Sequence, residues 1–359
     1  MRDKIYVNGR FLTQKITGVQ RVATEISTYL QFHYKEEIIF VCPNQEFINP
    51  VAESLNCINV GFFGGYLWEQ IELPFYLFRK KVTLLLNFCN TAPIMYNKNF
   101  LVIHDVAFKV NKKWFDWKFM FVYNILFYFN LKKAKKIITV SNFSKNEILK
   151  FYPKTKSEKI EVVYLGSFLG NKESILLKKK YYLAINSLNE RKNIKVIIDA
   201  FKLLDPNIYK LKVIGEKNTK VFKDSSYKTI SNVEFLDEVT DISLYKWIVE
   251  AKALINASFY EGFGLPALEA MSIYTPCILS NIPVYRELYS ETAFFFDVTS
   301  ANQLAQQVEV MEQSDNYFEI CKKGFELSQN FSWDITSKQY ILIIESFKKK
   351  TIYFEKSIN

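Results

Sequence analysis

A chain of 359 residues, 49% of them hydrophobic and 23% charged, is long enough for two folded domains and too apolar to be disordered. Its two histidines exclude a histidine-rich metal site, and its five cysteines lack the Cys-x-x-Cys spacing of a zinc site or redox pair. No Asp-x-Asp triplet is present to hold a divalent ion against a diphosphate, so we expect chemistry without a metal or other cofactor. The N-terminus lacks the apolar core of a signal peptide, and the scattered cysteines are typical of a reducing compartment, which predicts a cytoplasmic location.

The net charge of +10 is concentrated in one stretch of the chain. Residues 112–180 contain 16 lysines, no arginine and 5 acidic residues, a local balance of +11. This stretch indicates either an anionic partner, such as membrane headgroups or a lipid diphosphate, or only lysine-rich, solvated helix faces. The absence of arginine argues against nucleic acid as the partner, because bidentate contacts to phosphates and bases favour arginine.

Short runs of β-branched and aromatic residues alternate with longer helical patterns along the chain. Runs that are apolar on both faces and separated by helices are typical of parallel sheets built from βαβ units. One such sheet in each half predicts an α/β protein with two Rossmann-like domains. The predicted strands are 4–8, 36–42, 83–88, 100–105 and 135–141 in the first half, and 181–186, 209–215, 233–237, 251–258 and 276–280 in the second.

The segment from Trp114 to Lys136 is expected to form a helix that is apolar on all sides. It is too short and too often interrupted by polar residues to span a bilayer. A helix that is apolar all round is usually buried, so it is either a core helix or a helix that contacts a membrane surface with the help of its C-terminal lysines. The stripe expected on one face consists of Phe115, Phe119, Val122, Leu126 and Phe129.

Helical and strand periodicity is lost between Val163 and Lys180, where glycines and a lysine cluster indicate a domain boundary. The pattern from Trp333 to about Lys350 predicts one long helix. The predicted division is a domain over residues 1–170, a second domain over 171–335, and a C-terminal helix over 336–359 that packs back towards the first domain.

The strongest indication of chemistry is the run NASFYEGFGLPALEAM, which follows a predicted strand and leads into a helix. Gly262 and Gly264 allow backbone amides to approach a ligand closely, and Pro266 is suited to the first turn of a helix whose amides can receive phosphate or sugar oxygens. Glu261 precedes the loop and Glu269 follows eight positions later, so their carboxylates can reach a sugar and a ribose at opposite ends of one ligand. The alternative is a strand, a turn and a helix with surface acids.

The Glu-x7-Glu motif in EGFGLPALEAM resembles that of the retaining family 4 glycosyltransferases, which have the GT-B fold. This resemblance extends over nearly the whole chain and implies two Rossmann-like domains that face each other across a cleft. The acceptor would bind the N-terminal domain and the nucleotide sugar the C-terminal domain. Further segments similar to polysaccharide-assembly members of the family are ITGVQRVATEI, LWEQIELP, NFCNTAP, IHDVAF, ITVSNFSKNEI, NERKNIKVIIDAF and FSWDITSKQY.

The resemblance assigns the phosphate and sugar contacts of the second half. Arg191 and Lys192 match the diphosphate-binding pair of the family, and cations near the positive end of a helix are unfavourable unless an anion binds there. Asn186 stands where relatives often have glycine or arginine, so a second cation of some relatives is absent. Glu216 would contact the sugar or the base, and Glu269 the ribose. The loop that would hold the sugar consists of Gly262, Phe263, Gly264 and Leu265.

Two residues of the first half belong to the same predicted site. Gly18, in TGVQR, matches the glycine that lets the backbone close over the phosphates, or is an ordinary turn glycine. His104 ends a predicted strand at the sheet edge where ligands of open α/β sheets bind. The resemblance implies that it contacts the donor sugar or the reacting centre, and the alternative is a buried structural histidine. Asp105 is expected to orient the loop rather than to act as a base.

The resemblance implies a retaining, metal-independent glycosyltransferase. It would move a hexose or deoxyhexose, with mannose or rhamnose favoured, from a GDP-, dTDP- or UDP-linked donor to a saccharide acceptor on a polyprenyl diphosphate. The expected setting is O-antigen or capsule synthesis at the inner face of the cell membrane, with peripheral contact to anionic lipid and no nucleic-acid partner. The alternatives are a nucleotide-sugar epimerase on the same fold and a non-catalytic, saccharide-binding relative.

Overall fold

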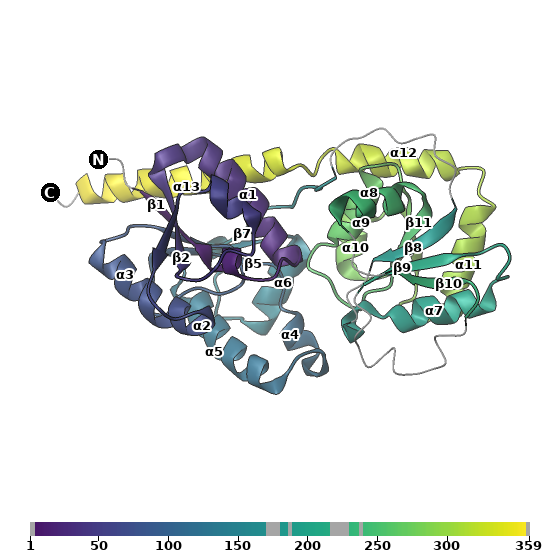
Figure 1. Ribbon diagram of the computed structural model, residues 1–359, viewed down its shortest axis with the longest axis horizontal. Coiled ribbons are helices and arrows are strands. Elements are labelled where there is room, and N and C mark those ends of the chain that lie inside the picture. The colour runs from purple at the N-terminus through teal and green to yellow at the C-terminus, as the bar shows by residue number, and fades with distance from the viewer. Residues whose placement is uncertain (1–3, 170–179, 186–188, 216–229, 237–239, 357–359) are drawn as a thin grey trace. The chain divides into compact units, whose positions relative to one another are not determined.

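A computed structural model describes residues 4–169, 180–185, 189–215, 230–236 and 240–356 of the chain (Figure 1). The chain forms two compact units. The first unit is Met1–Gly166 together with Trp333–Asn359, and the second is Ser167–Ser332.

The first unit is built on a seven-stranded sheet whose strands are all parallel, in the order β3-β2-β1-β4-β5-β6-β7. All residues of the inner strands β2, β4 and β5 are buried, which explains why their sequences are apolar without alternation. The strands are β1 (Ile5–Asn8), β2 (Ile38–Pro43), β3 (Cys57–Val60), β4 (Leu85–Asn87), β5 (Asn99–Ile103), β6 (Lys136–Thr139) and β7 (Ile160–Val162).

Helices cover this sheet, and the C-terminal helix belongs to the same unit. Figure 1 shows the yellow α13 beside the purple α1, and the hydroxyl of Tyr34 in α1 donates to Oε1 of Glu345 in α13 over 2.9 Å. Thr336 at the start of α13 donates to the carbonyl of Tyr164 over 2.7 Å. The helices are α1 (Gly18–Tyr34), α2 (Gly65–Leu67), α3 (Leu73–Arg79), α4 (Ala107–Val110), α5 (Trp117–Lys133), α6 (Asn142–Phe151) and α13 (Trp333–Lys356), with a π-helical turn over Trp68–Glu72.

The second unit has a six-stranded parallel sheet in the order β10-β9-β8-β11-β12-β13. A core of apolar side chains from α7, α11 and the sheet includes Tyr182, Phe201, Ile255 and Leu304. The strands are β8 (Tyr181–Ile185), β9 (Leu211–Ile214), β10 (Val233–Leu236), β11 (Ala251–Asn256), β12 (Cys277–Ser280) and β13 (Ala293–Phe296). The helices are α7 (Ile194–Leu203), α8 (Asp241–Val249), α9 (Leu265–Met271), α10 (Pro283–Tyr289), α11 (Ala301–Glu312) and α12 (Tyr317–Ser328).

The strand order of each sheet reverses direction at one point, between β1 and β4 in the first unit and between β8 and β11 in the second. The loops that follow the two strands at such a point leave towards opposite faces of the sheet and open a crevice at its carboxyl edge. Ligands of open α/β sheets bind in this crevice. It is therefore the position at which to look for a site in either unit.

All ten predicted strands are present, and the strands that the sequence did not indicate are β3, β7 and β13. These three lie at edges of the two sheets. Several of their residues are only partly buried. The sequences of β3 and β7 are interrupted by a polar residue and lack the continuous apolar run that marks an inner strand, whereas β13 has such a run and was missed by the prediction.

Helix α5 has one face in the core and one exposed face. It is therefore neither fully buried, as expected of a core helix, nor fully exposed. Asp116 caps the helix by accepting from the backbone N–H of Lys118 over 2.8 Å, which leaves Phe115 outside it. The predicted stripe is correct in part, because Leu126 is buried and Phe115 and Phe119 pack against the core, whereas Val122 and Phe129 are exposed. The face in the core consists of Met120, Tyr123, Leu126, Phe127 and Leu131. The opposite face is exposed and equally apolar, with Trp117, Phe121, Val122, Ile125, Tyr128 and Phe129.

Candidate functional site

The reversal point of the second sheet brings together two loops that lie far apart in the sequence. The loop after β8 ends in a 3₁₀ turn over Glu190–Lys192, which Asn189 caps by accepting from the N–H of Arg191 over 2.9 Å. The loop after β11 is the run from Ala257 onwards. The N–H of Phe259 donates to the carbonyl of Arg191 over 2.9 Å and joins the two loops.

The carboxylate of Glu261 lies between the two predicted phosphate-binding cations. Nη1 of Arg191 is 3.1 Å from Oε2 of Glu261, and Nζ of Lys192 forms an ion pair with Oε1. The hydroxyl of Ser258 donates to the same Oε1 over 2.7 Å, and Nη1 of Arg191 also donates to the carbonyl of Tyr260 over 2.7 Å. The fold thus assembles three predicted site residues from two loops about 70 positions apart. We call Arg191, Lys192 and Glu261 the charged triad.

The triad keeps Glu261 ionised although the residue is only 8% exposed. Burial raises the pKa of its carboxyl. The charges of Lys192 and Arg191, with hydrogen bonds from Lys192 and Ser258, outweigh burial and lower the pKa from an ordinary value of 4.5 to about 2. Glu261 therefore does not carry a proton near neutral pH. It can accept hydrogen bonds from ligand hydroxyls and cannot serve as a general acid there.

Gly264 shapes the loop that follows the triad. Its backbone has φ of +97°, and a Cβ at this position would lie 2.4 Å from Cε1 of Tyr285. The hydroxyl of Tyr289 donates to the carbonyl of Gly264 over 3.3 Å. This glycine is thus required both by the left-handed backbone and by the buried ring beside it. Helix α9 starts directly afterwards with Pro266 in its first turn, as the sequence predicted.

The other predicted residues of this loop differ in exposure. Phe263 is buried and meets the ring of Phe331 edge to face at 5.8 Å. Leu265 is partly exposed at the start of α9, whereas Glu269 is buried within the helix. Glu216 and Asn186 lie outside the described residues.

The structure places His104 and Gly18 in the first unit. His104 follows β5, and its Nε2 is 2.8 Å from the carbonyl of Phe88. A carbonyl oxygen only accepts, so Nε2 carries the proton of a neutral ring, and burial lowers the pKa of His104 below its ordinary 6.5. Gly18 is the first residue of α1, is exposed, and has open space where a Cβ would lie. The Asp105 carboxylate accepts from the N–H of Ala107 over 2.9 Å and so orients its loop.

Sequence reasoning missed a buried polar network at the reversal point of the first sheet. Nε of Arg10 is 3.0 Å from Oε2 of Glu69, which is 1% exposed. Asn8, at the end of β1, donates to the same Oε2 over 3.0 Å and to Oδ1 of Asn87, at the end of β4, over 3.1 Å. Thr91 accepts from Nη2 of Arg10 over 3.1 Å. The local sequence provided little signal for this network, because Glu69 lies between Trp68 and the polar Gln70 and its cationic partner is 59 positions away.

Two features are absent from the part of the chain that the structure describes. No three side chains of histidine, cysteine, aspartate or glutamate are grouped so that they could hold a metal ion. In the same part of the chain, no helix combines the length and the apolar character needed to cross a bilayer.

The second unit is similar in sequence to a known protein family. Residues 168–325 match the family of glycosyl transferases group 1. O-antigen chain mannosyltransferase B of Escherichia coli is 28% identical to this chain over 233 residues, which cover 59% of this chain and 61% of that protein. The N-acetylgalactosamine-N,N'-diacetylbacillosaminyl-diphospho-undecaprenol 4-alpha-N-acetylgalactosaminyltransferase of Campylobacter jejuni is 25% identical over 275 residues, 72% of this chain and 69% of that protein. The match to the Escherichia coli protein thus spans less than two thirds of its length.

A solved structure supports the fold. Alr3699/HepE of Anabaena, in complex with UDP and glucose, matches with a TM-score of 0.72 at 14% identity, covering 96% of this chain and 99% of that chain. Together with the two parallel sheets, this likeness confirms the predicted fold class of two Rossmann-like domains. Residues 168–325 are therefore similar to the group 1 glycosyl transferases, and the chain has the two Rossmann-like domains of its structural neighbour.

Proposed function

We propose that this protein is a retaining, metal-independent glycosyltransferase. It moves a hexose or deoxyhexose, with mannose or rhamnose favoured, from a GDP-, dTDP- or UDP-linked donor to a lipid-linked saccharide in O-antigen or capsule synthesis. The observation that carries the proposal is the charged triad, which holds two cations and a permanently ionised carboxylate at the reversal point of the second sheet. The family match of the second unit supports the same conclusion.

In this proposal the cations of the triad bind the donor diphosphate. When the glycosidic bond breaks, the leaving nucleoside diphosphate gains negative charge, which Arg191 and Lys192 stabilise from fixed positions. Glu261 forms an ion pair with each cation before the donor arrives, so that neither is buried without a counter-charge. With the donor bound, its carboxylate accepts hydrogen bonds from sugar hydroxyls, and Glu269 binds the ribose.

The proposed chemistry needs no carboxylate as nucleophile. The acceptor hydroxyl attacks the anomeric carbon on the face that the diphosphate leaves, which retains the configuration. A phosphate oxygen of the leaving group takes the hydroxyl proton, because the low pKa of Glu261 makes that carboxylate a poor base. His104, buried and neutral, contacts the sugar or the reacting centre in this proposal.

The first test is nucleotide binding. UDP, GDP and dTDP are added separately and the melting temperature is measured. A nucleotide at a hundredfold excess over its Kd stabilises the folded state by about 2.7 kcal/mol. We expect one of the three nucleotides to raise the melting temperature. The base of that nucleotide then narrows the choice of the donor sugar. If none of them does, the donor site proposed here is wrong.

The second test is transfer itself, with membrane lipid extract as acceptor and a labelled nucleotide sugar as donor. Lys192→Ala and Glu269→Ala are expected to abolish transfer, whereas Lys195→Ala, which removes an exposed lysine of α7, should not. A chelator should leave the rate unchanged. Full activity of Lys192→Ala would refute its role at the diphosphate. Interconversion of nucleotide sugars without acceptor would instead indicate an epimerase.

We further propose that the first unit contacts the anionic, cytoplasmic face of the membrane through α5. Its exposed apolar face ends in Lys132 and Lys133, a combination of aromatic and basic residues that suits a membrane interface. The lipid-linked substrate in the name of the Campylobacter relative supports such a location for this chain too. Wild type should sediment with anionic vesicles at low salt, and Phe121→Ser should weaken this binding. Phe318→Ser, in α12, is the control. Equal binding of all three proteins would contradict this role of α5.

A further inference from the structure

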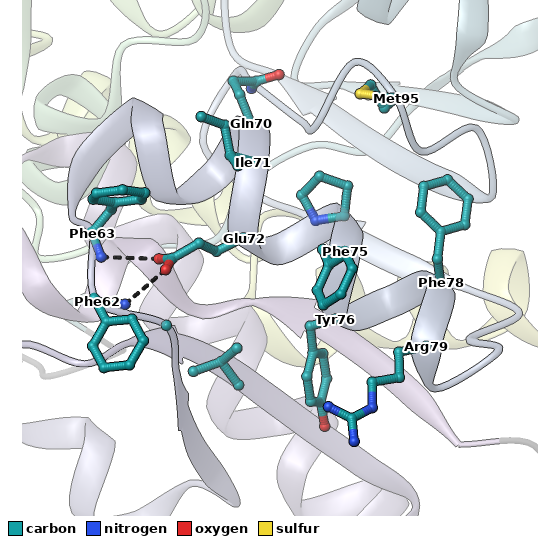
Figure 2. Close-up of a pocket in the computed structure, with 13 residues that line it drawn as sticks. Phe62, Phe63, Gln70, Ile71, Glu72, Phe75, Tyr76, Phe78, Arg79 and Met95 are labelled. Atoms are coloured by element: carbon teal, nitrogen blue, oxygen red, sulfur yellow. Dashed lines mark hydrogen bonds between the residues drawn. The ribbon is translucent and has the colours of Figure 1, made fainter.

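A groove with aromatic walls lies in the first unit, between the loop after β3 and helix α3 (Figure 2). Its volume is about 760 Å³, within the range of sites that bind small molecules. Figure 2 shows Phe62 and Phe63 on one side and Phe75 and Phe78 on the other. Met95 also lines the groove. We call it the aromatic groove.

The loop that carries Phe62 and Phe63 is held rigidly. Oε1 of Glu72 accepts from the N–H of Phe62 over 2.8 Å, and Oε2 accepts from the N–H of Phe63 over 2.9 Å (Figure 2). Gly61 has φ of +82°, and a Cβ there would lie 2.1 Å from Oε2 of the same carboxylate. A glycine is therefore needed for the carboxylate to reach both amides, and the backbone that carries the two rings is held in place before any ligand arrives.

The carboxylate of Glu72 and the amide of Gln70, which line the groove, are already occupied. Both oxygens of Glu72 accept from backbone amides. Nε2 of Gln70 donates to the carbonyl of Ala92 over 3.1 Å, and its Oε1 accepts from the N–H of Ile94 over 2.9 Å. A sugar or a nucleotide would find few groups with which to exchange its hydrogen bonds to water. The lining therefore suits a hydrocarbon ligand.

The walls of the groove expose large apolar side chains to solvent. Phe62 is 93% exposed and Phe75 is 71% exposed. Contiguous apolar surface of this kind marks a binding site for another molecule. Since the rings lie on both sides of one hollow, they can enclose one hydrocarbon chain.

Positive charge at one end of the groove indicates what the hydrocarbon is attached to. Arg79 lines the groove, and Lys80 and Lys81 follow it; all three are exposed. Among the described residues, no side-chain hydrogen bond or ion pair engages these three cations. They can therefore receive phosphate oxygens. The groove also lies near the C-terminal end of α5, because Nζ of Lys133 donates over 3.0 Å to the carbonyl of Ile94, the residue before Met95.

We propose that the aromatic groove binds the isoprenoid chain of the acceptor lipid, with Arg79 beside its phosphates. This inference rests on the lipid-linked acceptor of the proposed function. A branched, unsaturated hydrocarbon that carries a diphosphate matches both parts of the groove, namely the aromatic walls and the cations at one end. The groove thereby adds affinity at the lipid portion of the acceptor, separately from the donor site of the second unit.

The experiment uses the full chain and a photoreactive farnesyl diphosphate. After irradiation, the labelled peptides are identified by mass spectrometry. We expect labels within residues 60–79 or at Met95, and we expect undecaprenyl phosphate to displace the probe. Phe62→Ala and Phe75→Ala should each weaken binding about tenfold, the effect of removing one buried aromatic contact. Both side chains are exposed, so the melting temperature should stay unchanged. The control is Phe32→Ala in α1, whose ring is 82% exposed outside the groove.

Three competitors separate this proposal from its rivals. Displacement by pyrophosphate at the same concentration would show that charge alone binds the probe. Equal displacement by decyl phosphate would show that any alkyl chain suffices. Equal displacement by phosphatidylglycerol vesicles without isoprenoid would show that the groove contacts the bilayer. Each of these results overturns the isoprenoid assignment, and so does labelling outside the groove.

The outcome is independent of the test of the proposed function. The two phenylalanine variants should keep the nucleotide-induced shift in melting temperature, because that shift reports the second unit. If the wild-type protein binds no nucleotide but is labelled in the groove, the proposed function is refuted and this inference stands. If it binds nucleotide and transfers sugar but is not labelled in the groove, this inference is refuted and the proposed function stands.

Discussion

Replacing Glu261 by glutamine tests whether the charged triad exists in solution. The substitution keeps the size of the side chain and removes the charge between Arg191 and Lys192. The pKa of Glu261 falls from 4.5 to about 2 on folding. One pKa unit corresponds to about 1.4 kcal/mol, so the ionised carboxylate stabilises the fold by about 3 kcal/mol near neutral pH. We expect Glu261→Gln to lower the free energy of unfolding by about this amount at pH 7.

The pH dependence provides the sharper result. A carboxyl whose pKa is lowered in the folded state contributes its full stability above the unfolded pKa, and this contribution is lost as the pH falls from 4.5 towards 2. By pH 3, about 2 of the roughly 3 kcal/mol should be gone. The difference between wild type and Glu261→Gln should therefore shrink to about 1 kcal/mol at pH 3, since every other titrating group is common to both proteins.

The assay must report the second unit alone. Trp247, in α8, is a tryptophan of that unit, whereas Trp68, Trp114, Trp117 and Trp333 belong to the first. Urea unfolding followed by the ¹⁹F signal of fluorotryptophan at Trp247, assigned with Trp247→Phe, isolates the relevant transition. If the difference between the two proteins is the same at pH 7 and pH 3, the pKa of Glu261 is not lowered and the triad is not formed.

The same variant separates stability from ligand binding. Without the carboxylate, the two cations have lost their internal counter-charge, so a nucleoside diphosphate should raise the melting temperature of Glu261→Gln by more than that of wild type. Transfer should nevertheless fall, because the sugar loses an ionised acceptor of hydrogen bonds. A smaller nucleotide-induced shift in the variant would contradict the proposed place of the diphosphate beside Arg191 and Lys192.

Gly264→Ala forces a side chain into a left-handed backbone and against a buried ring, so we expect a loss of at least about 2 kcal/mol in urea unfolding. In Gly18→Ala the added Cβ would contact no other atom, so this variant should keep wild-type stability. A loss of transfer without a loss of stability would therefore support the role of Gly18 at the phosphates. Arg10→Met leaves the buried carboxylate of Glu69 without its cation and should cost about 3–5 kcal/mol, with partial recovery in the double variant with Glu69→Leu. Burial lowers the pKa of His104, so wild-type stability should fall as the pH drops below 6.5, and His104→Gln should lack this component of the decline in melting temperature.

Much of the fold could be predicted because it depends on properties of neighbouring residues. The inner strands are apolar on both faces, and this pattern marked all of them in the sequence. Edge strands such as β3 are partly exposed and carry a weaker pattern. The orientation of α5 was not predictable, because both of its faces are apolar and only packing decides which one joins the core.

For the candidate site, the amino-acid sequence alone indicated which loops carry the predicted binding residues. The glycines and acids of EGFGLPALEAM and the cations Arg191 and Lys192 follow predicted strands, and local spacing suffices to see them. Only the tertiary structure decided that Glu261 forms ion pairs with both cations, and that Arg10 pairs with Glu69 across 59 positions of chain. Such pairings depend on strand order, which brings distant loops to one sheet edge, and on burial, which makes an unpaired charge too costly to leave.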